Sequence, residues 1–187
     1  MRAINFLFLL AVFITSIFFS CSLPEPDIAF RLKNRRQAID SIIAKGGYPS
    51  HFVAVLNEHQ DINCYYQLFH DNSNSLAKAS ETYTRNNKTS DTTFVYYFDE
   101  DEKTIAFQVK ITVNNDSIFN SVTAFYNRDM DVIRKEYAII DNCDIPVDGK
   151  DSLSIDLTVY SIPPDVATFA LQKKINDYPY LYLNSFL

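Results

Sequence analysis

The sequence predicts an α+β domain in which an N-terminal helix packs on a twisted antiparallel meander sheet and a short second helix follows. Two observations predict this class: one uninterrupted helical segment near the start, and period-two alternation of apolar residues between short polar connections further on. The chain has 187 residues, of which 47% are hydrophobic and 21% charged, enough for one buried core. A closed lipocalin-like barrel is the alternative, but it needs about eight strands and six or seven are expected.

The predicted first helix covers residues 28–45, which contain neither glycine nor proline. Asp27 precedes the segment as a good N-cap, and Gly46 and Gly47 follow it as a stop signal. At 100° per residue one arc about 100° wide collects the apolar side chains, as expected for a helix packed on a core. These residues are Ile28, Leu32, Ile39, Ile42 and Ile43.

Alternation with period two dominates the rest of the chain. Its clearest case is 104–113, predicted as a half-buried antiparallel strand, and a second clean case is 153–160. Less regular strands are expected at 62–69, 92–98, 118–126 and 132–140. The short polar connections between them have hairpin lengths, so a meander from about residue 92 to residue 160 follows.

The remaining segments are assigned by composition. Residues 73–90 are polar and are predicted to form a long surface connection, with at most a short helical or strand piece near 76–83. A second helix is expected at 166–175, with Pro164 in its first turn. Residues 178–187, aromatic and interrupted by a proline, are expected to be a closing strand or a packed tail.

The first twenty residues have the features of an export signal. Arg2 lies near the start, residues 6–19 are apolar, and Ser20 and Cys21 follow. As a helix the apolar stretch would span about 21 Å, short of the roughly 30 Å hydrocarbon core of a bilayer. The segment therefore predicts export rather than a permanent membrane span.

Phe18-Phe19-Ser20-Cys21 resembles the lipobox of bacterial lipoproteins. The resemblance implies that residues 1–20 are a lipoprotein signal peptide and that Cys21 becomes the mature amino terminus, carrying acyl chains such as palmitate. Residues 21–27 would then be a tether reaching at most about 20 Å, and residues 28–187 a single domain held at the cell envelope, on the periplasmic or surface face of the outer membrane. A plain signal peptide cut near Ser20 or Ser22 is the alternative.

The chain has three cysteines. Assigning Cys21 to lipid leaves Cys64 and Cys143, one pair in an oxidising compartment, and predicts a structural disulfide between them. Such a bond would stabilise the fold by a few kcal/mol through its long closed loop.

The chemistry-bearing residues predict no catalytic, metal or cofactor site. The net charge of −6 argues against nucleic-acid binding, and three glycines exclude the glycine-rich nucleotide loops. His51, His59 and His70 lack metal-ligand spacing and are expected at the surface or at strand ends. The acidic cluster Asp141, Asp144, Asp148 and Asp151 lacks the calcium-loop pattern.

These observations favour a membrane-anchored, non-enzymatic binding module. Its expected partners are the membrane, through the lipid anchor, and a protein or glycan. Two alternatives stay open: a carrier of a small hydrophobic ligand held on the apolar sheet face, and a periplasmic hydrolase whose carboxylates or histidines converge only in three dimensions.

Overall fold

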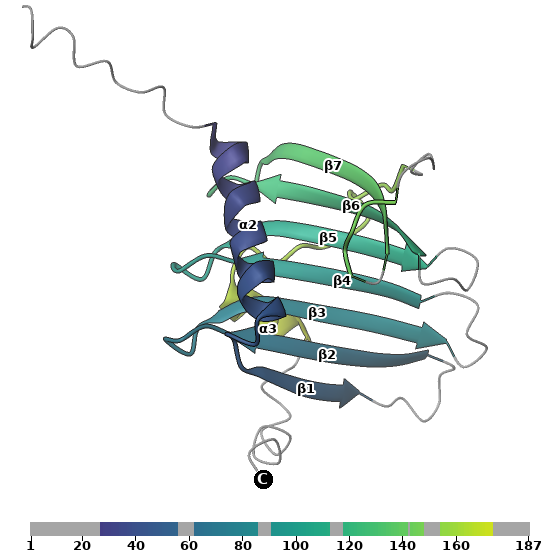
Figure 1. Ribbon diagram of the computed structural model, residues 1–187, viewed down its shortest axis with the longest axis horizontal. Coiled ribbons are helices and arrows are strands. Elements are labelled where there is room, and N and C mark those ends of the chain that lie inside the picture. Colours follow the sequence, from purple (N-terminus) through teal and green to yellow (C-terminus); the bar gives the residue numbers. More distant parts are fainter. Residues whose placement is uncertain are drawn as a thin grey trace, which may run out of the picture.

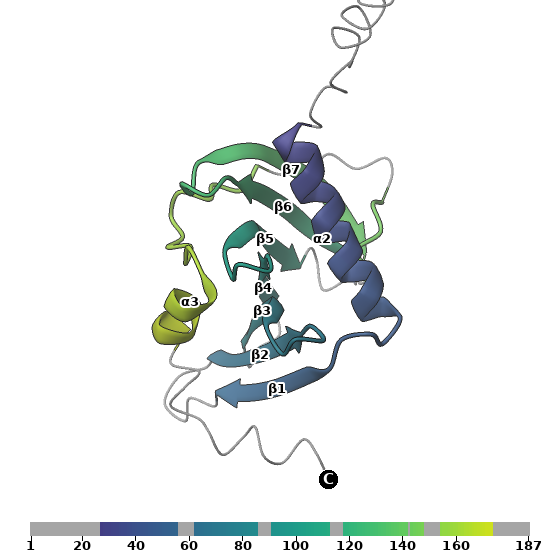
Figure 2. The same cartoon turned by 90° about the vertical axis from the view of Figure 1, so that its left-hand side faces the viewer.

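The computed structural model describes residues 27–55, 62–85, 91–112, 118–141, 143–147 and 154–173. They form three layers, with helix α2 on one face of a sheet and a segment ending in helix α3 on the other (Figures 1 and 2). The elements are α2 (Ile28–Ala44), β1 (Ser50–Val55), β2 (Ile62–His70), β3 (Leu76–Arg85), β4 (Asp91–Phe98), β5 (Thr104–Thr112), β6 (Ile118–Tyr126), β7 (Val132–Asp141) and α3 (Val166–Lys173).

The seven strands lie in the sheet in chain order, and every neighbouring pair is antiparallel. The predicted α+β class and the meander are confirmed. Strands β1 and β7 are the two edges of the described sheet, so it is not closed into a barrel and the lipocalin-like alternative is wrong. The meander also begins earlier than expected, at β1.

Helix α2 begins and ends where the sequence predicts. The Asp27 carboxylate accepts the Ala29 amide at 3.3 Å, as an N-cap does. Beyond the helix the Gly47 amide donates to the Ile42 carbonyl at 2.9 Å, and Gly46 has a φ of 71°. That left-handed conformation is available to glycine without a steric penalty.

A polar cluster holds α2 on the sheet. The carboxylate of Asp40 pairs with the Lys78 ammonium of β3 at 2.6 Å and accepts the hydroxyl of Tyr97, from β4, at 3.1 Å. The Arg36 guanidinium, one turn earlier on α2, lies 3.5 Å from the same carboxylate and over the Tyr97 ring. Because Tyr97 is fully buried, this contact ties the helix to the middle of the sheet.

Strand β5 is buried on both faces over its first six residues, so the expectation of a half-buried strand is wrong. Phe107 and Val109 face the layer that contains α3, while Ala106 and Gln108 lie on the face toward α2. Gln108 is 2% exposed and donates to the Ser121 hydroxyl at 2.8 Å. A hydrogen-bonded polar residue can therefore lie on a buried face of the sheet, although the alternation of polar and apolar residues predicts that this face is exposed to solvent.

Four connections share one turn geometry. Each begins with an Asp or Asn whose side chain accepts the backbone amides of the residues two and four positions later. The residue three positions after this Asp or Asn has a φ between 60° and 66°. The opening residues are Asp71, Asp99, Asn127 and Asp141. A turn followed by a left-handed residue is a standard hairpin solution, which explains the tight meander.

Two segments differ from the sequence prediction. The predicted surface connection contains β3, a ten-residue strand in the interior of the sheet. Its serine and threonine residues lower its apparent hydrophobicity, yet Ala79 and Glu81 are 0% exposed. An interior strand forms backbone hydrogen bonds with a neighbour on each side. The hydrophobicity of its side chains does not predict this backbone pairing.

The predicted strand at 153–160 does not form among its described residues, 154–160. Of its apolar residues, Leu157 is 4% exposed and belongs to the core, whereas Val159 is 72% exposed, and a short turn holds Asp156 and Thr158 at the surface. Helix α3 follows close to expectation, with Phe169 fully buried against Tyr96 and Phe98. The expected closing strand or tail at 178–187 lies outside the described residues.

Candidate functional site

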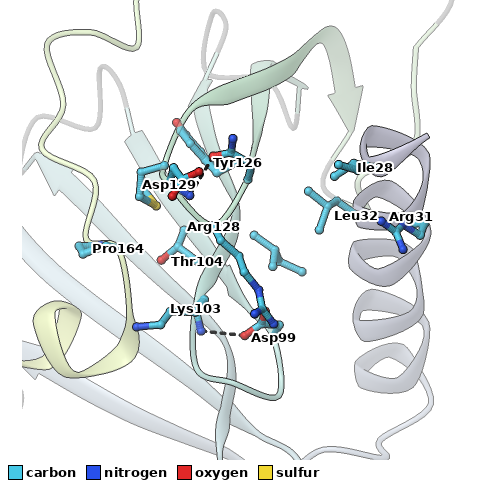
Figure 3. Close-up of a pocket in the computed structure, with 13 residues that line it drawn as sticks. Ile28, Arg31, Leu32, Asp99, Lys103, Thr104, Tyr126, Arg128, Asp129 and Pro164 are labelled. Carbon is cyan, nitrogen blue, oxygen red and sulfur yellow. Dashed lines mark hydrogen bonds between the residues drawn. The ribbon is translucent and has the colours of Figure 1, made fainter. Parts of the chain in front are cut away.

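A pocket of ≈ 440 Å³ lies at the end of the domain where α2 begins. We call it the tether-end pocket, because the predicted tether leads directly into this helix. Its walls come from the first turns of α2, the β4–β5 hairpin, the β6–β7 hairpin and Pro164 (Figure 3). The volume falls in the range typical of small-ligand sites.

Five apolar side chains line part of the pocket. Figure 3 shows Ile28 and Leu32 on the side of α2 that faces the two hairpins, with Pro164 on the opposite side of the pocket. Ile105 and Met130 complete the apolar lining. Ile105 is 4% exposed whereas Ile28 is 49% exposed, so the lining extends from the buried core to the surface.

Charged side chains of both signs also line the pocket: Arg31, Lys103 and Arg128, and Asp99 and Asp129. Lys103 donates to the Asp165 carboxylate at 3.1 Å, and Arg128 to Asp101 at 2.7 Å. The Arg128–Asp101 pair is largely exposed, at 81% and 65%, so solvent screens it and a ligand can replace it at small cost.

Tyr126 contributes a buried polar atom to the lining. The residue is 4% exposed, and its hydroxyl has no hydrogen-bond partner among the described residues. Burial raises the pKa of this phenol to about 12, so the hydroxyl remains a neutral donor. A buried donor without an acceptor costs free energy, which a ligand acceptor would recover.

Two charged groups of this pocket, Asp99 and Lys103, make contacts within the protein. One oxygen of Asp99 accepts the amides of Asp101 and Lys103 and thereby builds the turn. The Lys103 ammonium is paired with Asp165. An acid–base pair needs a free carboxylate or imidazole directed at the substrate, and these groups are engaged in structural contacts.

A second polar cluster lies on the α3 side of the sheet, around Glu81. One oxygen of its fully buried carboxylate accepts the hydroxyls of Tyr66 at 2.8 Å and Tyr83 at 2.5 Å. The other accepts the Tyr96 hydroxyl at 3.0 Å and pairs with the Lys173 ammonium at 2.7 Å. Four donors therefore satisfy one carboxylate and join α3 to three strands.

Burial raises the pKa of Tyr66, Tyr83 and Tyr96, and the neighbouring Glu81 raises each further. The three phenols therefore stay protonated and donate to the carboxylate. Glu81 has no exposed surface and no remaining acceptor position, so the cluster fastens α3 to the sheet. Two of its members, Tyr96 and Lys173, also line a shallow pocket of ≈ 430 Å³. Phe94 and Tyr160 are among the other residues that line this pocket.

The predicted disulfide is not formed. Cys64 and Cys143 are both free; Cys64 lies on β2 and Cys143 follows β7, five strands further across the sheet. At about 4.8 Å per strand they are far outside the Cα separation that a disulfide requires. Cysteine counting cannot reveal this separation, because it depends on strand order. Cys21, the predicted lipid attachment residue, lies outside the described residues.

Of the three histidines, His51 and His70 lie on β1 and at the end of β2, with ring centroids 5.1 Å apart, and His59 is outside the described residues. Asp141 and Asp144 belong to the turn after β7, where Asp144 pairs with Lys110 at 2.5 Å. No group of three or more metal-ligating side chains occurs among the described residues.

No described helix is long and apolar enough to cross a membrane.

Sequence reasoning named none of the residues of the tether-end pocket as a site. The pocket unites residues that are about seventy and one hundred positions apart, and no motif marks them. The only available signal was the short connection between the predicted anchor and Ile28. Comparison of the chain with protein-family models, curated proteins and solved structures finds no match.

Proposed function

We propose that this protein is a lipid-anchored, non-enzymatic binding module of the bacterial cell envelope. In this proposal Cys21 carries the acyl chains, residues 21–27 form the tether, and the domain binds its ligand in the tether-end pocket. The observation that carries the proposal is the position of that pocket, because the helix that follows the tether supplies one of its walls.

The tether brings the pocket close to the membrane. Six residue steps separate Cys21 from Asp27, and extended chain of that length reaches at most about 20 Å. Several acyl chains make the attachment stable, since each buried methylene contributes about 0.8 kcal/mol. The pocket therefore faces partners that reside in or near the same membrane.

The two alternatives are a carrier of a small hydrophobic ligand and a periplasmic hydrolase. Leu157 and Phe169 fill part of the α3 face of the sheet, but a pocket of ≈ 430 Å³ lined by Phe94 and Tyr160 lies on the same face, so the carrier hypothesis stays an alternative. In the tether-end pocket, Asp99 and Lys103 make contacts within the protein, which supports binding over hydrolysis at these two groups.

Substitution of Cys21 by Ser tests the anchoring. The natural protein, expressed with its leader, is expected to partition into detergent and to show acylated Cys21 by intact mass. The Cys21→Ser protein is expected to be released as a soluble or uncleaved form. A Cys143→Ser variant, which removes an exposed thiol from the domain, is the matched control. Equal detergent partitioning of the Cys21→Ser and natural proteins would contradict the proposal.

A further inference from the structure

We infer that the tether-end pocket holds one acyl chain of a zwitterionic phospholipid from the membrane that anchors the protein. This inference names the ligand class of the proposed binding module and rests on the anchoring at Cys21. Three independent features carry it: exposed apolar residues at this end of the domain, the apolar lining of the pocket, and the mixed charges at its mouth.

Exposed apolar side chains occur at this end of the domain, and Ile28 among them lines the pocket. Ile28 and Phe30, in the first turn of α2, are 49% and 53% exposed, and Val132 at the start of β7 is 45% exposed. Six residue steps join the predicted anchor to Asp27, the residue before this turn. An exposed apolar patch at the end nearest a bilayer is stabilised by contact with the lipid interface.

The lining suits a hydrocarbon chain that enters from that interface. Leu32 and Met130 are partly buried pocket residues, and Ile105 is buried at 4% exposure, compared with 49% for Ile28. Acyl carbons in contact with these side chains are removed from water at about 25 cal/mol per Å². A lipid ester carbonyl is also an acceptor of the kind that the buried Tyr126 hydroxyl lacks.

The charges at the mouth match a head group that carries both signs. Arg31, Lys103 and Arg128 complement a phosphate, and Asp99 and Asp129 complement an ammonium group. The same two carboxylates would oppose a purely anionic head group. The balance of charges therefore selects a zwitterionic lipid over an anionic one.

Photo-crosslinking of the anchored, full-length protein tests the inference. The protein is reconstituted through its own anchor into vesicles that contain phosphatidylcholine with a diazirine at the end of one acyl chain. Residue-level mass spectrometry is expected to find adducts on Leu32 and Met130, inside the pocket. Adducts confined to the exposed Phe30 and Val132 would show bilayer contact without an occupied pocket and would overturn the inference, as would the absence of adducts.

Variants and a second probe test the head-group selection. Arg128→Ala should lower the adduct yield on Leu32 and Met130 about threefold, the effect expected of one exposed charge contact. Lys135→Ala removes an exposed cation outside the pocket and should leave the yield unchanged; equal yields for the two variants would contradict head-group binding. An anionic phosphatidylglycerol probe should label the pocket several-fold less, and equal labelling would remove the zwitterionic preference.

Failure of this inference is distinguishable from failure of the proposed function. If the protein enters vesicles through acylated Cys21 but Leu32 and Met130 remain unlabelled, the anchoring stands and the lipid ligand is wrong. If Cys21 is unmodified in the natural protein, the proposed function fails first, before the pocket is tested.

Discussion

Glu81 is a buried carboxylate that depends on its hydrogen-bond donors and its ion pair. It is a charged side chain with no exposed surface, held by three phenol donors and one ammonium group. Burying a carboxylate is unfavourable unless all its acceptor positions are satisfied, and here they are. The same contacts gather residues of β2, β3, β4 and α3, so one side chain couples the sheet to the layer above it.

Replacing Glu81 by Gln should destabilise the fold by about 3 kcal/mol, because the Lys173 ammonium loses its counter-charge and the amide presents donors to phenol donors. Urea denaturation measures the change. Asp101→Asn, which removes the partner of the exposed Arg128, is the matched control and should cost less than about 0.5 kcal/mol. Equal losses for the two variants would show that the buried cluster contributes no more than a surface pair.

At the scale of elements, α3 depends on its first-turn contacts. Asp165 accepts the Thr168 amide at 2.8 Å as an N-cap and pairs with Lys103, while the hydroxyl of Thr104 donates to the Pro163 carbonyl at 2.6 Å. The helix has only eight residues, too few for stability on its own. Its cap and its docking contacts therefore decide whether it forms.

The Asp165 cap makes the stability of α3 dependent on pH. Hydrogen bonds from Thr168, together with Lys103, lower the pKa of Asp165 from 3.8 to about 2. A lowered folded-state pKa contributes stability that is fully present above the unfolded value and is lost as the pH falls through about 2. Hydrogen exchange of the α3 amides should accelerate over this window.

Asp165→Asn separates the charge from the cap, because asparagine caps helices well but does not titrate. Its α3 amides should exchange with a weaker dependence on pH below 4 than those of the natural protein. Asp165→Ala, which removes the cap itself, should cost about 1 kcal/mol at neutral pH. An unchanged pH profile for Asp165→Asn would assign the acid sensitivity to another group.

At the scale of the whole molecule, the sheet order separates the two domain thiols. Burial raises the pKa of Cys64, while Cys143 is exposed. Thiol labelling of the folded protein should therefore find both Cys64 and Cys143 free, and Cys143 should react with iodoacetamide first. Reductant should leave the midpoint of unfolding unchanged, and a shift to lower denaturant would show that the two cysteines pair after all.

Much of the architecture follows from local patterns. The cap at Asp27, the glycine pair after α2, and the positions of β2, β4, β6 and β7 all follow from residue types within a few positions of each boundary. Prediction failed where burial and hydrogen bonding came from distant neighbours. The serine- and threonine-rich β3 became an interior strand, and the alternating segment 154–160 covered the sheet without joining it.

The sequence by itself determined the α+β class, the first helix and the short turns, because these depend on contacts between residues close in the chain. Only the tertiary structure decided that Cys64 and Cys143 lie apart, that Glu81 is buried, and that a pocket opens beside the first turns of α2. Strand order and the packing of two layers bring distant residues together, and a side chain's environment then depends on neighbours that local patterns do not encode.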